Sequence, residues 1–180
     1  MEIIDIFAPY LYSVQYDEND IDEYHRLFQE WNDKTFVSDF LEANEKLLNG
    51  STWKDTPSPE AAALKISREA EELEEKFHEL KNNANGNKKP DFDSHFDYLD
   101  GEYKFVYELC PMKSYGTETP SFLRIYAIKL DANCYLITGG GIKLNKKIQN
   151  SPGLKDHVIK NIDKVLMWMK QNGIMGSDDV

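Results

Sequence analysis

Apolar residues follow two different periods along this chain. Between residues 20 and 82 they recur at intervals of three and four positions, which is the spacing of an amphipathic helix. In residues 3–16, and again in residues 102–144, they form short runs or alternate with polar residues, as they do in β-strands. The pattern therefore predicts an α+β fold.

The predicted strands lie at the start of the chain and in a later meander. Two apolar runs, broken by Ala8-Pro9, indicate a strand, a turn and a second strand or extended segment. Three consecutive antiparallel strands are predicted at residues 102–112, 122–130 and 134–144. The last two are joined at Asp131-Ala132-Asn133, since Asp and Asn tolerate turn geometry. We expect a small antiparallel β-sheet made of this meander plus the N-terminal strand.

Helices are predicted between these two β regions and after them. Asp20 and Glu23 have the form of a capping box at the start of a short helix, and a second helix stops at Asn49-Gly50. Ser58-Pro59 begins the clearest helix, because Ser is a good N-cap and Pro fits the first helical position. The last helix covers residues 154–171 and is amphipathic. We expect the helices to pack on one face of the sheet.

The helix that follows Ser58 is strongly acidic. Its predicted apolar face consists of Ala63, Ile66, Ala70, Leu73, Phe77 and Leu80. Most of its other faces carry glutamates, namely Glu69, Glu71, Glu72, Glu74, Glu75 and Glu79. These glutamates form either a solvated surface with some intrahelical ion pairs or a shield for the basic part of the chain.

The charge is distributed unevenly over a chain of 180 residues, a length that fits one domain. We expect a single α+β domain with an acidic helical insertion at about residues 17–90 and the meander plus C-terminal helix at about 102–173. The net charge is −11, yet residues 121–173 hold nine basic side chains against three acidic ones. The whole molecule is therefore a poor non-specific binder of nucleic acid, while its basic part can attract a phosphate backbone.

Several functional classes are not supported by the sequence. The start of the chain, Met1 to Asp5, lacks the features of a signal peptide, and no apolar run is long enough to span a bilayer, so we expect a cytoplasmic protein that does not bind membranes. In that compartment Cys110 and Cys134 are expected to be reduced thiols. His25, His78, His95 and His157 lack the spacing of metal ligands, and we expect neither a metal nor a cofactor.

Candidate chemistry gathers around the second strand of the meander. Arg124 and Tyr126 are two residues apart and so share one face of that strand. Arg124 either forms a salt bridge with an acid of the N-terminal helices or joins Lys143, Lys146 and Lys147 in a cationic group. Such a group can bind phosphates and stabilise charge that develops on one. Gly139–Gly141 fits a bulge or a close backbone approach better than a phosphate loop, because no helix follows it.

The order of these motifs resembles a known family. The motifs that carry the resemblance are a strand with Arg124 and Tyr126, a strand closed by Gly141-Ile142, the pair Lys146-Lys147, and Pro152 before a helix. The chain that contains them resembles the C-terminal half of the RelE/ParE superfamily of toxins, especially the HigB-like branch. The likeness covers the chain from Glu102 onward. It implies a RelE-like fold and a ribosome-dependent endoribonuclease that activates the ribose 2′-hydroxyl of mRNA for attack on the adjacent phosphate. The implied partner is an antitoxin protein.

Two functions follow from the sequence. In the first, an RNA-cleaving toxin, Arg124 binds the phosphate, Lys146 and Lys147 supply charge and proton transfer, and Tyr126 stacks on a base or hydrogen-bonds the ribose. Lys143 and Lys129 are then expected to bind RNA. In the second, the same scaffold is a non-catalytic binding protein that docks a protein partner through the basic patch or the acidic helix.

Overall fold

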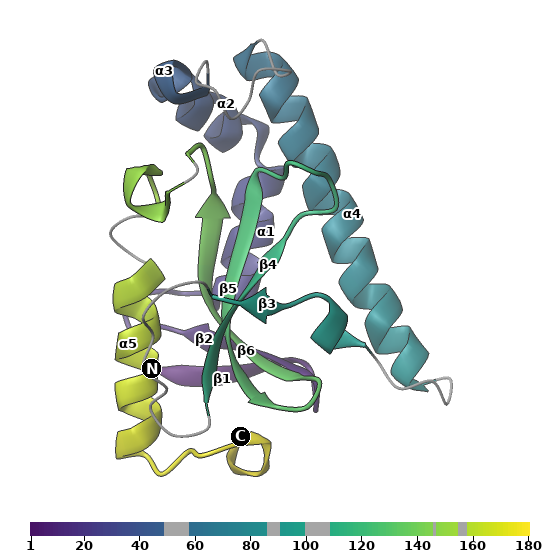
Figure 1. Ribbon diagram of the computed structural model, residues 1–180, viewed down its shortest axis with the longest axis vertical. Helices are drawn as coiled ribbons and strands as arrows, with labels where there is room; N and C mark the ends of the chain where they lie inside the picture. The colour runs from purple at the N-terminus through teal and green to yellow at the C-terminus, as the bar shows by residue number, and fades with distance from the viewer. Residues whose placement is uncertain (49–57, 86–90, 100–108, 146, 155–157) are drawn as a thin grey trace.

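A computed structural model describes residues 1–48, 58–85, 91–99, 109–145, 147–154 and 158–180. It contains one six-stranded mixed sheet with helices against it, which confirms the predicted α+β class (Figure 1). The strands are β1 (Glu2–Phe7), β2 (Leu11–Gln15), β3 (Asp97–Tyr98), β4 (Cys110–Tyr115), β5 (Leu123–Asp131) and β6 (Cys134–Ile142).

The sheet is mixed rather than antiparallel, and this corrects the prediction. Its order is β1-β2-β6-β5-β4-β3, and β2 runs parallel to β6 while the other neighbours are antiparallel. The parallel register pairs Leu11 with Tyr135 and Ser13 with Ile137. The N-terminal hairpin thus joins the meander through a contact between residues more than a hundred positions apart, which local periodicity does not report.

The meander agrees with the predicted strands in part. β5 and β6 lie where they were expected and are joined at Asn133, which has a positive φ of 58°. β4 continues to Tyr115, beyond the predicted end at Met112, because its pairing with β5 extends to Tyr115 opposite Arg124. Ser114 is buried there, although its polar side chain breaks the apolar pattern. The expected strand positions 102–108 lie outside the described residues. The short strand β3 was not predicted.

The helices are α1 (Glu23–Asn32), α2 (Lys34–Ala43), α3 (Glu45–Leu48), α4 (Pro59–Asn85) and α5 (Val158–Gln171), with 3-10 turns at Phe92–Ser94, Ile148–Asn150 and Ser177–Asp179. The N-cap of α1 is Asp22, not Asp20, and its carboxylate accepts the backbone N–H of Tyr24. The second predicted helix is divided into α2 and α3 at Asn44. α4 begins at Pro59, as predicted.

Helices cover both faces of the sheet, so the prediction that they share one face is wrong (Figure 1). α1, α2 and α4 pack against the face that carries Ile125 and Ile137. α5 packs against the other face, where Tyr126 and Leu136 are buried. Successive side chains of a strand point to opposite faces, and β5 and β6 have apolar residues at both parities. A sheet of this composition needs a cover on each side.

One glutamate of α4 is not part of its solvated surface. Glu69 is buried, and one of its carboxylate oxygens accepts a hydrogen bond of 2.6 Å from the Ser121 hydroxyl. Its other oxygen has no partner among the described residues. Burial raises the pKa of the Glu69 carboxyl, although the Ser121 hydrogen bond opposes the change. Glu71, Glu72, Glu75 and Glu79 are exposed, as a wet helix surface predicts.

Candidate functional site

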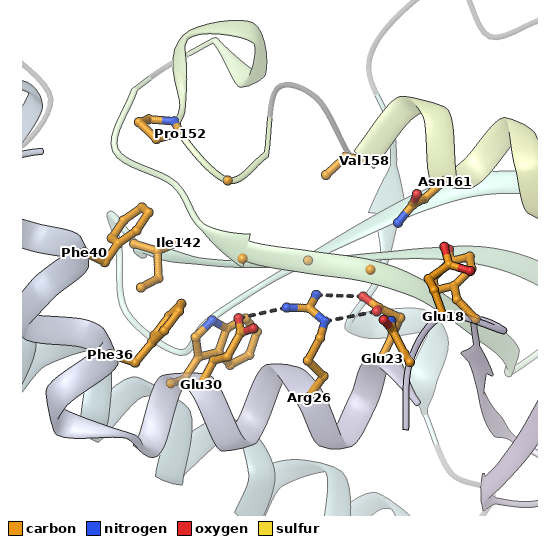
Figure 2. Close-up of a pocket in the computed structure, with 17 residues that line it drawn as sticks. Glu18, Glu23, Arg26, Glu30, Phe36, Phe40, Ile142, Pro152, Val158 and Asn161 are labelled. Atoms are coloured by element: carbon orange, nitrogen blue, oxygen red, sulfur yellow. Dashed lines mark hydrogen bonds and ion pairs between the residues drawn. The ribbon is translucent and has the colours of Figure 1, made fainter. Parts of the chain in front are cut away.

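The best candidate for a site is a pocket of about 460 Å³ along the last part of β6. We call it the β6 pocket; it lies between α1 and α2 on one side and α5 with the Pro152 loop on the other (Figure 2). The residues that matter most for its chemistry are Glu18, Glu23, Arg26, Glu30, Trp31, Phe36, Phe40, Gly139–Ile142 and Asn161.

The floor of the β6 pocket is a strand edge. The pairing of β2 with β6 ends at Ile137, and among the described residues no strand pairs with that side of Gly139–Ile142. The Lys143 N–H donates to the Phe122 carbonyl at 2.7 Å, so the backbone of residue 143 faces β5. Because hydrogen-bonding direction alternates along an antiparallel strand, the backbone groups of Gly140 and Ile142 face away from β5. We call residues 139–142 the open edge of β6.

The glycines allow the Arg124 carbonyl and the Leu27 side chain to approach the backbone of the open edge closely. A Cβ atom on Gly140 would lie 2.3 Å from the Arg124 carbonyl oxygen and 2.8 Å from Leu27 Cδ1 of α1. Gly139 and Gly141 have φ values of +156° and +157°, which L side chains rarely adopt. The register between β5 and β6 also shifts just before this run. The prediction of a bulge or close backbone approach is therefore confirmed.

Charged side chains of α1 form one wall of the β6 pocket. The Arg26 guanidinium donates to both oxygens of Glu23, at 3.0 and 2.7 Å, and lies 2.8 Å from Glu30 Oε2 (Figure 2). Burial would lower the pKa of Arg26, but the hydrogen bonds and negative charges of Glu23 and Glu30 together outweigh burial and raise it. At the other end Glu18 is paired with Lys164 at 3.0 Å. Three carboxylates therefore face two cations, which leaves one negative charge in excess.

Aromatic side chains form the end of the β6 pocket near α2. The Phe36 and Phe40 rings are stacked, with centroids 6.4 Å apart and planes 14° from parallel, and Phe36 is 37% exposed. Trp31 also lines the pocket but is only 1% exposed. Its indole N–H has no hydrogen-bond acceptor in the described part of the chain. A buried donor without a partner costs about 1–3 kcal/mol of stability.

The predicted pair Arg124 and Tyr126 lies in β5, on the α5 face and outside the β6 pocket. One nitrogen of Arg124 donates to the carbonyls of Ser121 and Leu123, at 3.0 and 2.5 Å, and the guanidinium stacks 4.2 Å from the Tyr115 ring centre. Burial lowers the pKa of Arg124. Tyr126 is 1% exposed, and burial raises the pKa of its hydroxyl to about 12. Neither side chain is presented openly to a ligand.

Of the predicted lysines, Lys129 does not lie with Arg124. Lys129 lies on the opposite face of β5, where its ammonium is 2.7 Å from Asp93 Oδ1 and also faces the Tyr135 ring. Lys143 follows β6 at the same end of the sheet as Arg124, and Lys147 is exposed in the next loop. Lys146 lies outside the described residues. Strand alternation separates Lys129 from Tyr126, since their positions differ by an odd number of residues.

The sequence interpretation missed the acidic wall of the β6 pocket. Glu23, Arg26 and Glu30 recur at helical spacing on α1, and this was the available signal. The same spacing is common on solvated helix surfaces, so it does not tell which charged face meets a strand. Asn161 reaches the pocket from α5, which no local pattern connects with α1.

The described residues were also compared with two other kinds of feature, a metal centre and a membrane-spanning helix. Among them no group of three or more His, Cys, Asp or Glu side chains is placed to hold a metal ion, and no helix is long and apolar enough to cross a membrane. Cys110 and Cys134 are buried free thiols, as predicted, and burial raises the pKa of Cys134 to about 11. No family model matches the chain, and no curated protein or solved structure is significantly similar to it.

Proposed function

We propose that this chain is a non-catalytic interaction protein that docks a polypeptide partner in the β6 pocket. The observation that carries the proposal is the open edge of β6, which lines a pocket and pairs with no strand of the described residues on that side. Unpaired strand edges bind other polypeptides readily, because backbone donors and acceptors need partners. An extended segment beside Gly139–Ile142 satisfies them by strand addition.

The electrostatics favour a polypeptide over a nucleic acid. The charges on the wall of the β6 pocket sum to a negative value, and the whole chain carries −11. A phosphate backbone brought to this pocket meets repulsion, whereas a polypeptide can supply positive charge where it is needed.

The likeness to RelE/ParE toxins is consistent with this role as a scaffold. The helical pair α1–α2 precedes the meander, Gly141-Ile142 closes β6, and Pro152 lies before α5. An RNA-cleaving enzyme of that kind would need Arg124 and Tyr126 to be accessible together with the lysines. Here Arg124 is bonded to backbone carbonyls and Tyr126 is buried. The partner that the resemblance implies, an antitoxin protein, belongs to the class that the β6 pocket favours.

To test the proposal, Phe36 is replaced by a photo-crosslinking amino acid, and the protein is irradiated in the cells that naturally produce it. We expect an adduct of defined mass that protease removes and ribonuclease does not. The matched control carries the same group at Met167, which is 63% exposed on α5 and does not line the β6 pocket. An adduct that ribonuclease removes, or adducts of equal yield at both positions, would contradict polypeptide docking at this pocket.

A second experiment tests directly whether the protein cleaves RNA. Wild type and the Arg124→Ala variant are induced at equal levels, and mRNA integrity and growth are followed. A non-catalytic protein leaves transcripts intact in both cultures. Transcript cleavage by wild type that Arg124→Ala abolishes would refute the proposal in favour of the RNA-cleaving toxin.

A further inference from the structure

We infer that the segment bound in the β6 pocket inserts one arginine side chain between Glu30 and the Phe36–Phe40 ring pair. This inference rests on the proposed function and deepens it, because it names the side chain that the partner must carry. It draws on three features of the pocket, namely its excess charge, its aromatic end and the open edge of β6.

The charge balance of the pocket calls for one cation. Arg26 is shared between Glu23 and Glu30, and Lys164 is paired with Glu18. Glu23 is buried and accepts two hydrogen bonds from Arg26, so its negative charge is balanced. Glu30 receives Arg26 at one oxygen only, and its side chain is 30% exposed. Glu18 is more exposed, at 64%, but it has Lys164 to itself. Of the two carboxylates that share Arg26, Glu30 is the more exposed, so the excess negative charge is most accessible there.

The aromatic end beside Glu30 selects the shape of that cation. Phe36 and Phe40 present nearly parallel rings at the same end of the pocket as Glu30 (Figure 2). A planar guanidinium stacks on aromatic faces and can also bind a carboxylate through two N–H groups, whereas an ammonium is compact and strongly hydrated. The combination of flat rings and a partly exposed carboxylate thus fits arginine better than lysine.

The backbone of the same segment can use the remaining groups. Gly140 and Ile142 offer backbone N–H and carbonyl groups that face away from β5. The occupant is accordingly an extended chain rather than a free cation.

The probe for this inference is a set of capped heptapeptide mixtures with a fixed central residue. Arginine, lysine, glutamate or citrulline is placed at the centre, and the other six positions vary among valine, threonine and serine. Citrulline keeps the shape of arginine but has no charge. Each mixture is captured on the immobilised full-length protein and its retention is quantified by mass spectrometry. We expect arginine mixtures to be retained about tenfold better than citrulline mixtures, the gain of one charge-assisted hydrogen bond.

Two variants locate the selectivity. Glu30→Gln keeps the shape of the wall and should reduce the arginine-to-citrulline ratio to about one, whereas Glu75→Gln, on the exposed surface of α4, should keep the wild-type ratio. Phe36→Leu should remove the preference for arginine over lysine. Circular dichroism checks that each variant is folded.

The outcomes separate the inference from the proposed function. Arginine selectivity that disappears with Glu30→Gln and survives Glu75→Gln supports the inference. Equal retention of all four mixtures, retention of none, or selectivity that persists in Glu30→Gln overturns it. A protease-sensitive adduct at Phe36 in cells still supports polypeptide docking in those cases, and the absence of that adduct defeats the proposed function itself.

Discussion

A single methyl group added at Gly140 should destabilise the protein strongly. The new Cβ atom would lie 2.3 Å from the Arg124 carbonyl oxygen and 2.8 and 3.2 Å from the two Cδ atoms of Leu27. The carbonyl belongs to the paired strand β5, and Leu27 is fully buried, so neither can move away without disturbing its neighbours. Overpacking of this kind costs about 1–3 kcal/mol.

Part of that cost is offset in the unfolded state. Alanine restricts the unfolded chain more than glycine does, which contributes about 0.4–1 kcal/mol in favour of folding. Because one of the contacts involves backbone, we expect Gly140→Ala to fall at the high end, with a net loss of about 2 kcal/mol. For a urea slope of about 2 kcal/mol/M, the unfolding midpoint falls by about 1 M.

The assay is equilibrium unfolding in urea, followed by tryptophan fluorescence and circular dichroism. Gly176→Ala is the matched control, because a Cβ atom there would lie 3.7 Å from the Leu130 carbonyl oxygen, an ordinary contact. We expect the control to change stability by less than about 0.5 kcal/mol. Equal midpoints for Gly140→Ala and wild type would refute the close approach of α1 and β5 to this part of β6.

Three further changes test groups outside the β6 pocket. Burial raises the pKa of Glu69, so the folded state binds the carboxyl proton more tightly than the unfolded state does. The free energy of unfolding of wild type therefore falls as pH rises from the usual carboxyl pKa through the raised one. Glu69→Gln should flatten that part of the plot of stability against pH. Burial alone would raise the pKa of Asp93, but hydrogen bonds from Lys129 and Tyr135 lower it, so stability is lost as pH falls through the folded-state pKa. Asp93→Asn should remove that acid loss and cost about 2 kcal/mol at pH 7. Lys129→Met should cost about 1 kcal/mol and the exposed Lys147→Met less than about 0.5 kcal/mol in the same urea assay.

These three results can each fail in a distinct way. A Glu69→Gln profile parallel to that of wild type would mean that this carboxyl is not buried in solution. Acid sensitivity that survives in Asp93→Asn would assign it to another group. Equal losses at Lys129 and Lys147 would contradict the ion pair between Lys129 and Asp93.

The sequence predicted the elements whose signals are local. β5 and β6 were recognised because β-branched and aromatic residues form two runs around an Asp-Ala-Asn turn. The start of α4 was recognised from Ser58-Pro59, since capping chemistry lies within one turn of the helix. α1 was correctly predicted to be a helix, but its N-cap was assigned to Asp20 instead of Asp22. Both aspartates are acceptable caps, and only the backbone geometry chooses between them.

Much less of the candidate site could be predicted from the sequence. Arg124 and Tyr126 do share a face, as strand alternation requires, but the degree to which each is buried depends on α5 and on Tyr115. Lys129 was predicted to bind RNA together with Lys143, whereas alternation turns Lys129 to the face that holds Asp93, opposite Arg124 and Tyr126. A count of charges along the chain does not distinguish two faces of one strand.

By itself, the sequence determined the periods of the elements, the division into acidic and basic parts, and the expectation of a bulge or close backbone approach at residues 139–141. These follow from the chemistry of residues and of their nearest neighbours. Only the tertiary structure decided that β2 pairs in parallel with β6, that this pairing ends at Ile137, and that α1 brings Glu23 and Glu30 to the edge left open. Those contacts join residues about a hundred or more positions apart, and they form because burial of the whole apolar surface selects one arrangement that no local pattern encodes.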